Sequence, residues 1–324
     1  MTAPYTRPDV AMLLAYLNSA PGPKMHEVGA PAAREMYEQM KELVDLPVGE
    51  LAVVQDLAIP GPAGTIPARL FDARATREPG PAVVYFHGGG HTIGNIATHA
   101  GFCAEIARVL DLPVVSVDYR LAPEHAFPAA PDDAEAAARW VAGSPAELGR
   151  TVTGLVLSGD SAGGNLAIVA ALDLRDRPAA VPVIAQLPIY PATDYSRDYP
   201  SYAALCEGHL LTRASMDWFT ASYAPDVASL RVSPLNADLA GLPPAVVMTA
   251  SLDPIRDQGR AYAAKLAEAG VPVVFREAVG NIHGFVTLRK AIPSAQGDVA
   301  GFLTAAKAVI AEAEAQRVMA QAAA

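Results

Sequence analysis

An alternation of strand-like and helix-like segments constrains the fold of this chain more than any other feature of the sequence. Short apolar runs rich in β-branched residues recur from Gly49 to about residue 310, and several are continuous rather than alternating, which is typical of strands buried on both faces. The runs span residues 53–54, 66–71, 82–86, 114–117, 155–157, 183–187, 245–248 and 271–275. Helical stretches lie between the later runs, at about 101–110, 131–142, 162–174 and 255–269. This order predicts an α/β fold whose mostly parallel sheet has helices on both faces.

Two segments fall outside this alternation. Residues 1–48 are predicted to be helical, with Met36, Met40 and Leu43 at helical spacing. Residues 191–235 are too long for a simple loop and contain Trp218 and Phe219. We expect the two segments to form one helical cap over a catalytic domain made of residues 49–190 and 236–324, although helices without catalytic consequence remain an alternative. Residues 300–324 are expected to form a long helix with a frayed end.

Composition narrows the class of partner and the compartment. The formal net charge of −10 disfavours binding to nucleic acid or anionic lipid. Two cysteines, Cys103 and Cys206, fit buried residues better than a disulfide. The apolar segment 11–17 is short for a signal peptide, and no run approaches the roughly 18 apolar residues of a membrane span. We therefore expect a cytoplasmic protein.

A candidate nucleophile is Ser161, within Gly159-Asp160-Ser161-Ala162-Gly163. The motif follows an apolar strand and precedes a helical run, which is the context of a nucleophile elbow. Glycines at both ends allow strand and helix to approach closely. Alone, the motif does not distinguish a reactive serine from a glycine-rich loop.

The loop His87-Gly88-Gly89-Gly90 directly follows another predicted strand. Successive glycines can turn their N–H groups toward one point, as an oxyanion requires. A phosphate cradle is a weaker interpretation, because no Gly-Lys-Ser/Thr follows and the chain is acidic.

Asp253 and His283 are the candidate acid and base. Asp253 follows a predicted strand and is expected to orient a histidine, with helix capping before Pro254 as the alternative, whereas Asp257 is expected inside the next helix. His283 lies between glycines after the last strand and is the only histidine C-terminal to both other candidates. The chain order Ser, Asp, His is that of α/β hydrolases.

The remaining histidines and paired acids carry less weight. We expect His91 at the mouth of the pocket, His99 exposed and His125 in a loop. No pair has convincing metal-ligand spacing, so neither a metal nor another cofactor is expected. Asp132 and Asp133 are expected to begin a helix rather than to act as a glycosidase pair.

Together these motifs resemble the hormone-sensitive-lipase-like branch (family IV) of bacterial esterases. The resemblance includes the stretches His87–Gly90, Asp118–His125, Gly159–Gly164, Asp253–Asp257 and His283–Phe285. It implies an eight-stranded hydrolase sheet, a helical cap, a structural role for Asp118–His125 and a tendency to dimerise. His91 and Asn281 stand where other residues are commoner in this branch.

The sequence therefore predicts a carboxylesterase that acts on short- to medium-chain acyl esters through an acyl-enzyme. Ser161, Asp253 and His283 form the expected triad. The expected oxyanion donors are the N–H groups of Gly88, Gly89 and Ala162, and the pocket candidates are His91, Asp160 and Ile282. An amidase or carbamate hydrolase with the same triad, and a non-catalytic small-molecule receptor on the same fold, are the alternatives.

Overall fold

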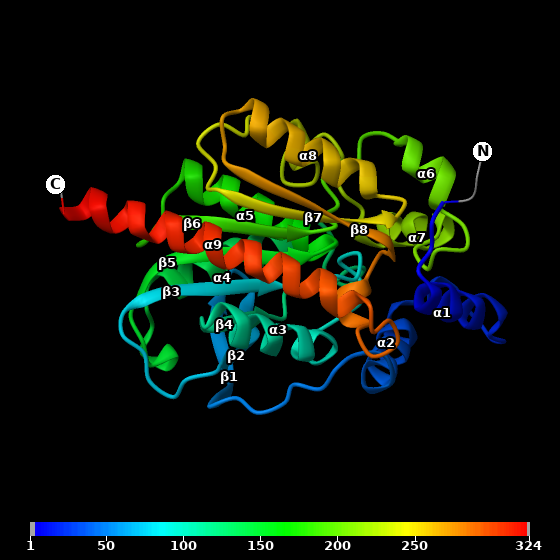
Figure 1. Ribbon diagram of the computed structural model, residues 1–324, viewed down its shortest axis with the longest axis horizontal. Coiled ribbons are helices and arrows are strands. Elements are labelled where there is room, and N and C mark those ends of the chain that lie inside the picture. The colour runs from blue at the N-terminus through cyan, green and yellow to red at the C-terminus, as the bar shows by residue number, and fades with distance from the viewer. Residues whose placement is uncertain (1–3, 323–324) are drawn as a thin grey trace.

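A single eight-stranded sheet runs through the protein, in the order β1-β2-β4-β3-β5-β6-β7-β8. We describe residues 4–322 of a computed structural model, drawn in Figure 1. The strands are β1 Val53–Gly61, β2 Gly64–Asp72, β3 Gly80–Phe86, β4 Val114–Val117, β5 Val152–Asp160, β6 Val183–Ile189, β7 Ala245–Leu252 and β8 Val273–Ile282. Strand β2 pairs antiparallel with β1 and β4, and all other neighbours are parallel. The predicted α/β-hydrolase architecture is confirmed.

The burial of each strand follows its sequence pattern. In β3, β4 and β5 nearly every residue is buried, because helices cover both faces of the central sheet. Strand β1 alternates instead between buried and exposed positions, in keeping with its place at the sheet edge. Each predicted apolar run lies within or overlaps one of these strands, and most strands extend beyond the run.

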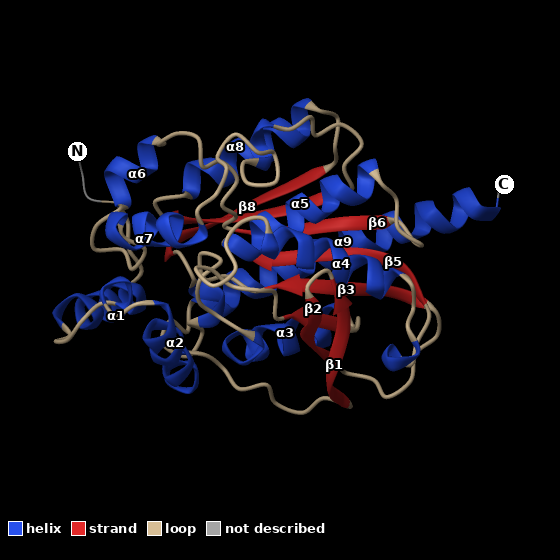
Figure 2. Cartoon of the chain, turned by 180° about the vertical axis from the view of Figure 1, so that it is seen from behind, coloured by secondary structure: helices blue, strands red, loops and turns tan. Residues whose placement is uncertain are grey.

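Helices pack on both faces of the sheet (Figures 1 and 2). Their bounds are α1 Pro8–Ser19, α2 Ala30–Val44, α3 Ile96–Leu110, α4 Ala129–Ala142, α5 Ala162–Asp176, α6 Pro200–Leu205, α7 Arg213–Tyr223, α8 Arg256–Glu268 and α9 Ala295–Ala322. One apolar core contains residues of α4, α5 and α8, and the other contains residues of α3 and α9. Helix α9 is longer than predicted at its start, and residues 323–324 of the expected frayed end lie outside the described residues.

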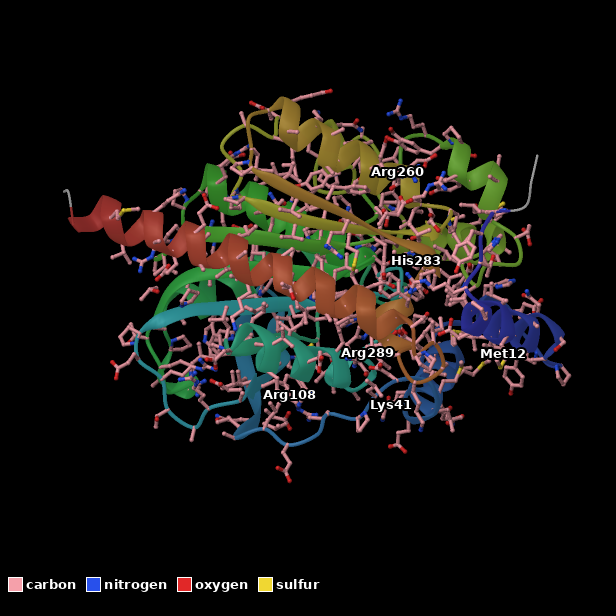
Figure 3. All side chains as sticks on the ribbon, viewed as in Figure 1. Met12, Lys41, Arg108, Arg260, His283 and Arg289 are labelled. Atoms are coloured by element: carbon pink, nitrogen blue, oxygen red, sulfur yellow. The ribbon has the colours of Figure 1, made fainter. Side chains whose placement is uncertain are left out.

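The helices outside the alternating pattern gather at one end of the molecule, where α1, α2, α6 and α7 lie (Figure 1). The two segments touch, since the side-chain amide of Asn18 donates to the carbonyl oxygen of Gly208 at 3.2 Å. The N-terminal segment is also fastened to the main body by a buried ion pair between Asp45 and Arg289, with 2.8 Å between Oδ1 and Nε. Figure 3 labels Arg289 below His283.

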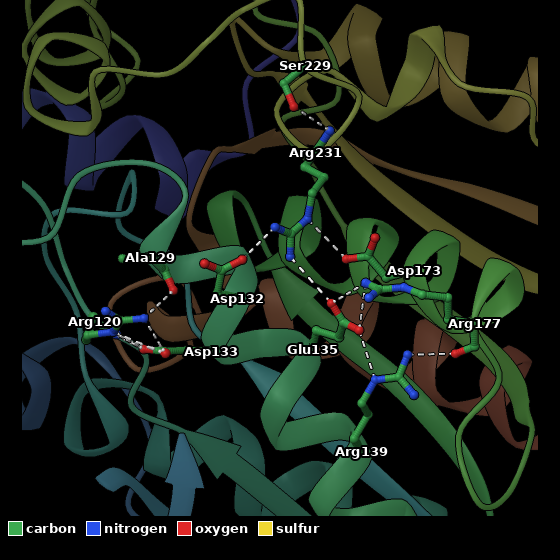
Figure 4. Close-up of polar contacts among 10 residues, drawn as sticks. All are labelled: Arg120, Ala129, Asp132, Asp133, Glu135, Arg139, Asp173, Arg177, Ser229 and Arg231. Carbon is green, nitrogen blue, oxygen red and sulfur yellow. Dashed lines mark hydrogen bonds and ion pairs between the residues drawn. The ribbon is translucent and has the colours of Figure 1, made fainter. Parts of the chain in front are cut away.

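The end of the 191–235 segment is joined to the helical layer by an ion-pair network (Figure 4). Arg231 reaches Asp132 at 2.6 Å, Asp173 at 3.2 Å and Glu135 at 3.7 Å, so it connects this segment with α4 and α5. Asp133 is bound instead by Arg120 at 2.8 Å. The two neighbouring acids of α4 therefore serve separate ion pairs.

The structure bears on two expectations from composition, namely the absence of a membrane span and the state of the two cysteines. Among the described residues, no helix combines the length and the apolar character needed to cross a bilayer. Cys103 is buried and Cys206 is half-buried, and both are free thiols.

Candidate active site

Ser161 occupies a sharp turn between β5 and α5. Its φ of 56° and ψ of −118° lie outside the regions that ordinary residues prefer, which is the strained conformation of a nucleophile elbow. The turn is held by a hydrogen bond from Ser161 N to the carbonyl oxygen of Ile189 at 2.9 Å. A Cβ on Gly159 would overlap Gly163, and a Cβ on Gly163 would overlap the carbonyl oxygen of Phe86. Both glycines are therefore sterically required.

Replacing Gly163 with alanine is expected to destabilise the protein strongly. The added methyl would meet backbone of β3, which has less freedom to move than a side chain, so the cost should reach or exceed the upper end of the usual range of about 1–3 kcal/mol for overpacking. Chemical denaturation measures the change in the free energy of unfolding. Gly297→Ala is the matched control, because a Cβ there, in α9, meets no atom within 4 Å. Equal stability of the two variants would contradict the prediction.

Ser161, His283 and Asp253 meet at the carboxyl ends of three strands. Ser161 Oγ lies 2.8 Å from His283 Nε2, and His283 Nδ1 lies 2.7 Å from Asp253 Oδ2. Asp253 follows β7 and His283 follows β8, so the ends of parallel strands bring together residues far apart in sequence. This arrangement assigns the Nδ1–H of His283 as the donor to Asp253, and leaves Nε2 to accept the proton of Ser161.

Asp253 also contributes to the turn that leads into α8. Its Oδ1 accepts a hydrogen bond from the amide of Ile255 at 2.9 Å, while Oδ2 faces His283. The orienting and loop-stabilising interpretations of this acid are thus compatible. Asp257 lies inside α8 as predicted, where its carboxylate accepts from the amide of Ser201 at 3.0 Å and from Arg256 at 2.9 Å.

The glycine loop after β3 differs from the prediction at one donor. The amide of Gly88 donates to Asp160 Oδ1 at 2.8 Å, so this N–H is committed to a carboxylate and is not available to an oxyanion. Gly89, Gly90 and Ala162 line the cavity at Ser161 instead, and within residues 4–322 their amides donate to no acceptor. The hydrogen bond to Asp160 therefore contradicts the expectation for Gly88, and Gly90 is the other glycine of this loop that lines the cavity.

The stretch Asp118–His125 supports this glycine loop, in keeping with its expected structural role. The hydroxyl of Tyr119 donates to the carbonyl oxygen of His87 at 2.7 Å, and the amide of Ala122 donates to that of His91 at 2.8 Å. These two bonds hold the loop at both of its ends.

Asp160 is a buried anion beside the nucleophile. Its Oδ1 accepts from the hydroxyl of Tyr85 at 2.7 Å as well as from Gly88, and Oδ2 accepts from Tyr190 at 3.4 Å. Nε2 of His99 lies 3.3 Å from Oδ1. Burial alone would raise the pKa of Asp160, but His99 and the hydrogen bonds from Tyr85 and Gly88 outweigh it and lower the pKa. Asp160 lines the cavity as expected, although its carboxylate is engaged inside the protein.

Because the pKa of Asp160 is lowered, we expect its carboxylate to stabilise the folded protein at neutral pH and to lose this effect at acidic pH. A carboxylate with a lower pKa in the folded than in the unfolded protein stabilises the fold above the unfolded value of about 3.9 and loses this effect as the pH falls through the folded pKa. Asp160→Asn should therefore be less stable at pH 7 but lose less stability between pH 5 and pH 3 than the wild type. Denaturation curves at several pH values measure this, with the exposed Asp217→Asn as control. A stability difference independent of pH would contradict the assignment.

A cavity of about 240 Å³ opens above Ser161. Its lining is mostly apolar and comes largely from the two segments outside the alternating pattern. The larger apolar side chains are Met25, Met40, Val44, Ile93, Leu210, Leu211, Met216, Phe219, Ile255 and Leu288. Tyr37, Asp194, Tyr195, Tyr202 and Gln258 add polar groups. Burial raises the pKa of the Tyr37 and Tyr195 hydroxyls, which stay protonated. Among the described lining residues there is no lysine or arginine, so the cavity offers no side-chain cation to an anionic ligand.

Two predicted pocket residues lie elsewhere. His91 is buried and stacks on Tyr223 with 3.9 Å between ring centroids, and it does not line the cavity. Ile282 is fully buried at the end of β8 and does not line the cavity, and its amide donates to Asn281 Oδ1 at 3.0 Å. The neighbouring Asn281 donates to Asp298 of α9 at 3.1 Å. Both pocket expectations are wrong.

Sequence reasoning also missed residues that the structure places at the site. His99 is fully buried rather than exposed, and it shares a helical face with Phe102, Cys103 and Ile106, a spacing that could have indicated its burial. Tyr190 packs its ring 4.6 Å from that of His283. No periodic signal in the sequence marks Tyr190, because it lies just after the end of β6 and its own φ is positive. Within residues 4–322, no group of three potential metal ligands lies together.

Comparison with known proteins agrees with this geometry. Residues 83–287 match a family model described as alpha/beta hydrolase fold. The carboxylesterase NlhH of Mycobacterium tuberculosis is 38% identical over 304 residues, which cover 91% of this chain and 95% of that protein. The ethyl acetate hydrolase of Pseudomonas putida is 36% identical over 281 residues, covering 84% and 87%.

A solved structure extends the likeness to three dimensions. An alpha/beta hydrolase enzyme from the metagenome of Lake Arreo, Spain, superposes with a TM-score of 0.89 at 38% identity. The superposition covers 94% of this chain and 98% of the other. The likeness thus extends over nearly the whole length of both chains.

Proposed function

We propose, on the premise that this chain belongs to the α/β-hydrolase family and to its hormone-sensitive-lipase-like esterases, that Ser161, His283 and Asp253 form its catalytic triad. The chain is a serine carboxylic-ester hydrolase, and its relatives include an esterase, a carboxylesterase and an ethyl acetate hydrolase. The observation that carries the residue assignment is the continuous line of hydrogen bonds from Asp253 through His283 to Ser161 Oγ.

In the acylation step, His283 Nε2 removes the proton from Ser161 as Oγ attacks the ester carbonyl carbon. Asp253 holds the imidazole in the required tautomer and stabilises the cation that forms. The amides of Gly89, Gly90 and Ala162 then bind the negative oxygen, and one such donor is worth about 3–4 kcal/mol in the transition state. His283 delivers its proton to the leaving alcohol when the carbon–oxygen bond breaks.

In the deacylation step, water replaces the alcohol. His283 takes a proton from the water as its oxygen attacks the acyl carbon, and the same amides stabilise the second tetrahedral intermediate. Breaking the bond to Ser161 Oγ releases the carboxylic acid and returns the proton to the serine. The triad and the amides suffice for both steps.

The cavity supports short- to medium-chain, uncharged acyl esters as substrates. Its volume of about 240 Å³ and its mostly apolar lining favour compact apolar groups over long triglyceride chains. The similarity to an ethyl acetate hydrolase agrees with small substrates. Residues 1–48 and 191–235 are proposed to act together as the cap, because both contribute apolar side chains to the cavity.

We also propose a cellular location and an oligomeric state for the enzyme. Two free thiols favour a reducing compartment such as the cytoplasm. A homodimer is proposed from the family resemblance alone, and size-exclusion chromatography with light scattering tests it.

Activated esters of increasing acyl length test the function. We expect kcat/KM for p-nitrophenyl esters to be highest at two to eight carbons, roughly, and to fall for longer chains because the cavity fills. A sulfonyl fluoride should label Ser161 in a one-to-one ratio, as mass spectrometry of the peptide would show. Hydrolysis without labelling, or labelling of another serine, would refute the residue assignment, whereas a preference for long chains would refute only the substrate range.

A further inference from the structure

We propose that Tyr223, the last residue of α7, is a positioning residue that holds the glycine loop His87–Gly90, called the oxyanion loop below, through its stacked contact with His91. The proposal rests on the proposed function, since it concerns the same donors, Gly89 and Gly90. It gives the 191–235 segment a role in transition-state stabilisation in addition to its part in forming the cavity.

The contact between the two rings is close and nearly parallel. Their centroids are 3.9 Å apart and their planes meet at 8°, and both side chains are about 1% exposed. His91 directly follows Gly90 and has a φ of 57°, in the left-handed region that costs energy for a residue with a side chain. The backbone of His91 is held by the hydrogen bond from the amide of Ala122 to its carbonyl oxygen at 2.8 Å, and its side chain is held by the Tyr223 ring that stacks on it.

Ring packing, rather than hydrogen bonding, makes this contact. Both ring nitrogens of His91 and the hydroxyl of Tyr223 are buried and have no hydrogen-bond partner within the described residues. Burial also lowers the pKa of His91 to about 3, so its imidazole is neutral and behaves as a flat aromatic surface. A phenylalanine at either position should consequently preserve the interaction.

A second aromatic residue of α7 rests on the same loop. Phe219 lies one turn before Tyr223, and residues four apart share a helix face. A Cβ on Gly90 would overlap the Phe219 ring, so this ring lies directly against the glycine. Helix α7 therefore covers Gly90 of the loop and His91 directly after it, one with each aromatic ring.

Tyr223 is itself fixed to the main body of the protein. Its carbonyl oxygen accepts from the amide of Phe127 at 3.0 Å, and the Phe127 ring meets its ring edge-on at 5.9 Å. The contact thus joins α7, the oxyanion loop and the segment before α4 in one packed unit.

The effect of Tyr223 can be separated from substrate binding. Phe219 lines the cavity, whereas Tyr223 does not, so Tyr223 reaches the reaction only through the loop. Loss of its ring should let the amides of Gly89 and Gly90 move from their positions. Because these donors act mainly in the transition state, kcat should fall while KM stays nearly constant.

The experiment compares variants that remove a ring with variants that keep one. Tyr223→Ala and His91→Ala should each lower kcat for p-nitrophenyl butyrate by about 10- to 100-fold, less than complete loss of an oxyanion donor. Tyr223→Phe and His91→Phe should retain kcat within about threefold, because ring packing rather than a hydrogen bond makes the contact. The double alanine variant should be little worse than either single one, as expected for residues in contact.

A second measurement distinguishes loop positioning from general destabilisation. A trifluoromethyl ketone forms a tetrahedral adduct with the serine, and its affinity should fall in parallel with kcat in the alanine variants. All assays are run below the unfolding transition of each variant, and Tyr223→Leu, which keeps bulk but not a flat ring, replaces Tyr223→Ala if that variant does not fold. Unchanged kcat and adduct affinity in the ring-less variants, or equal loss in His91→Phe and His91→Ala, would overturn the proposal. Failure of the proposed function would instead appear as absent wild-type hydrolysis.

Discussion

Ser161→Ala is expected to abolish ester hydrolysis while leaving the fold intact. The hydroxyl is the only group that the proposed mechanism uses to form the acyl-enzyme, and Oγ makes its hydrogen bond to His283 rather than to a structural partner. Losing the nucleophile of a triad lowers kcat by on the order of 10⁴- to 10⁶-fold. Removing it costs little structure, because the strained turn is defined by backbone contacts and by Gly159 and Gly163.

The measurement is the initial rate of p-nitrophenyl butyrate hydrolysis, with circular dichroism as the check on folding. Ser215→Ala provides a matched control within the same cavity, since the Ser215 hydroxyl bonds to Thr212 at the start of α7 and has no partner in the triad. This variant should keep most of the activity. A folded Ser161→Ala protein with more than a few per cent of wild-type kcat would mean that another nucleophile carries the reaction.

Asp253→Asn is expected to have the second largest effect, a loss of about 10³- to 10⁴-fold in kcat. An asparagine amide can present its N–H₂ to His283 and favour the tautomer whose Nε2 carries a proton, which then has no lone pair for the Ser161 hydroxyl. The variant also lacks the negative charge that stabilises the imidazolium. KM should change little, because Asp253 does not line the cavity.

Asp257→Asn is the matched control for this experiment. It makes the same chemical change four residues later, at a carboxylate bound to Ser201 and Arg256 rather than to histidine. Its kcat should stay within about tenfold of the wild type, with any loss arising from the contact between α6 and α8. Comparable losses in the two variants would contradict the choice of Asp253, and hydrolysis rates together with melting curves decide between the outcomes.

The sequence predicted those features of the fold that depend on local pattern. Each apolar run corresponds to a strand, and the loops after β5, β7 and β8 carry Ser161, Asp253 and His283 because parallel strands end at the same edge of a sheet. Chain order, rather than any single motif, brought these three together in the prediction. The likeness to known esterases then followed from motifs spread over much of the chain.

The incorrect predictions concern the orientation of amides and side chains, which the order of residues in the sequence does not determine. Three successive glycines indicate a loop able to offer amides, but the orientation of each amide depends on neighbours such as Asp160, which takes the N–H of Gly88. The sequence analysis places His91 at the mouth of the pocket, yet its positive φ turns the ring against Tyr223, a residue 132 positions later in the chain. Such a contact depends on how α7 packs against the loop after β3, and no local pattern in the sequence indicates this packing.

The buried pair of Asp45 and Arg289 has a consequence for building chimeric esterases. The Arg289 side chain is about 1% exposed and its Nε lies 2.8 Å from Asp45 Oδ1, so one buried ion pair joins the segment 1–48 to the residues after β8. An exchange of the first 48 residues for those of a relative with another residue at position 45 would leave a guanidinium buried without its counter-ion, which costs about 3–5 kcal/mol. A segment exchanged to transfer substrate preference must therefore also carry an acidic residue at position 45 to pair with Arg289. This requirement is separate from any contact with the substrate.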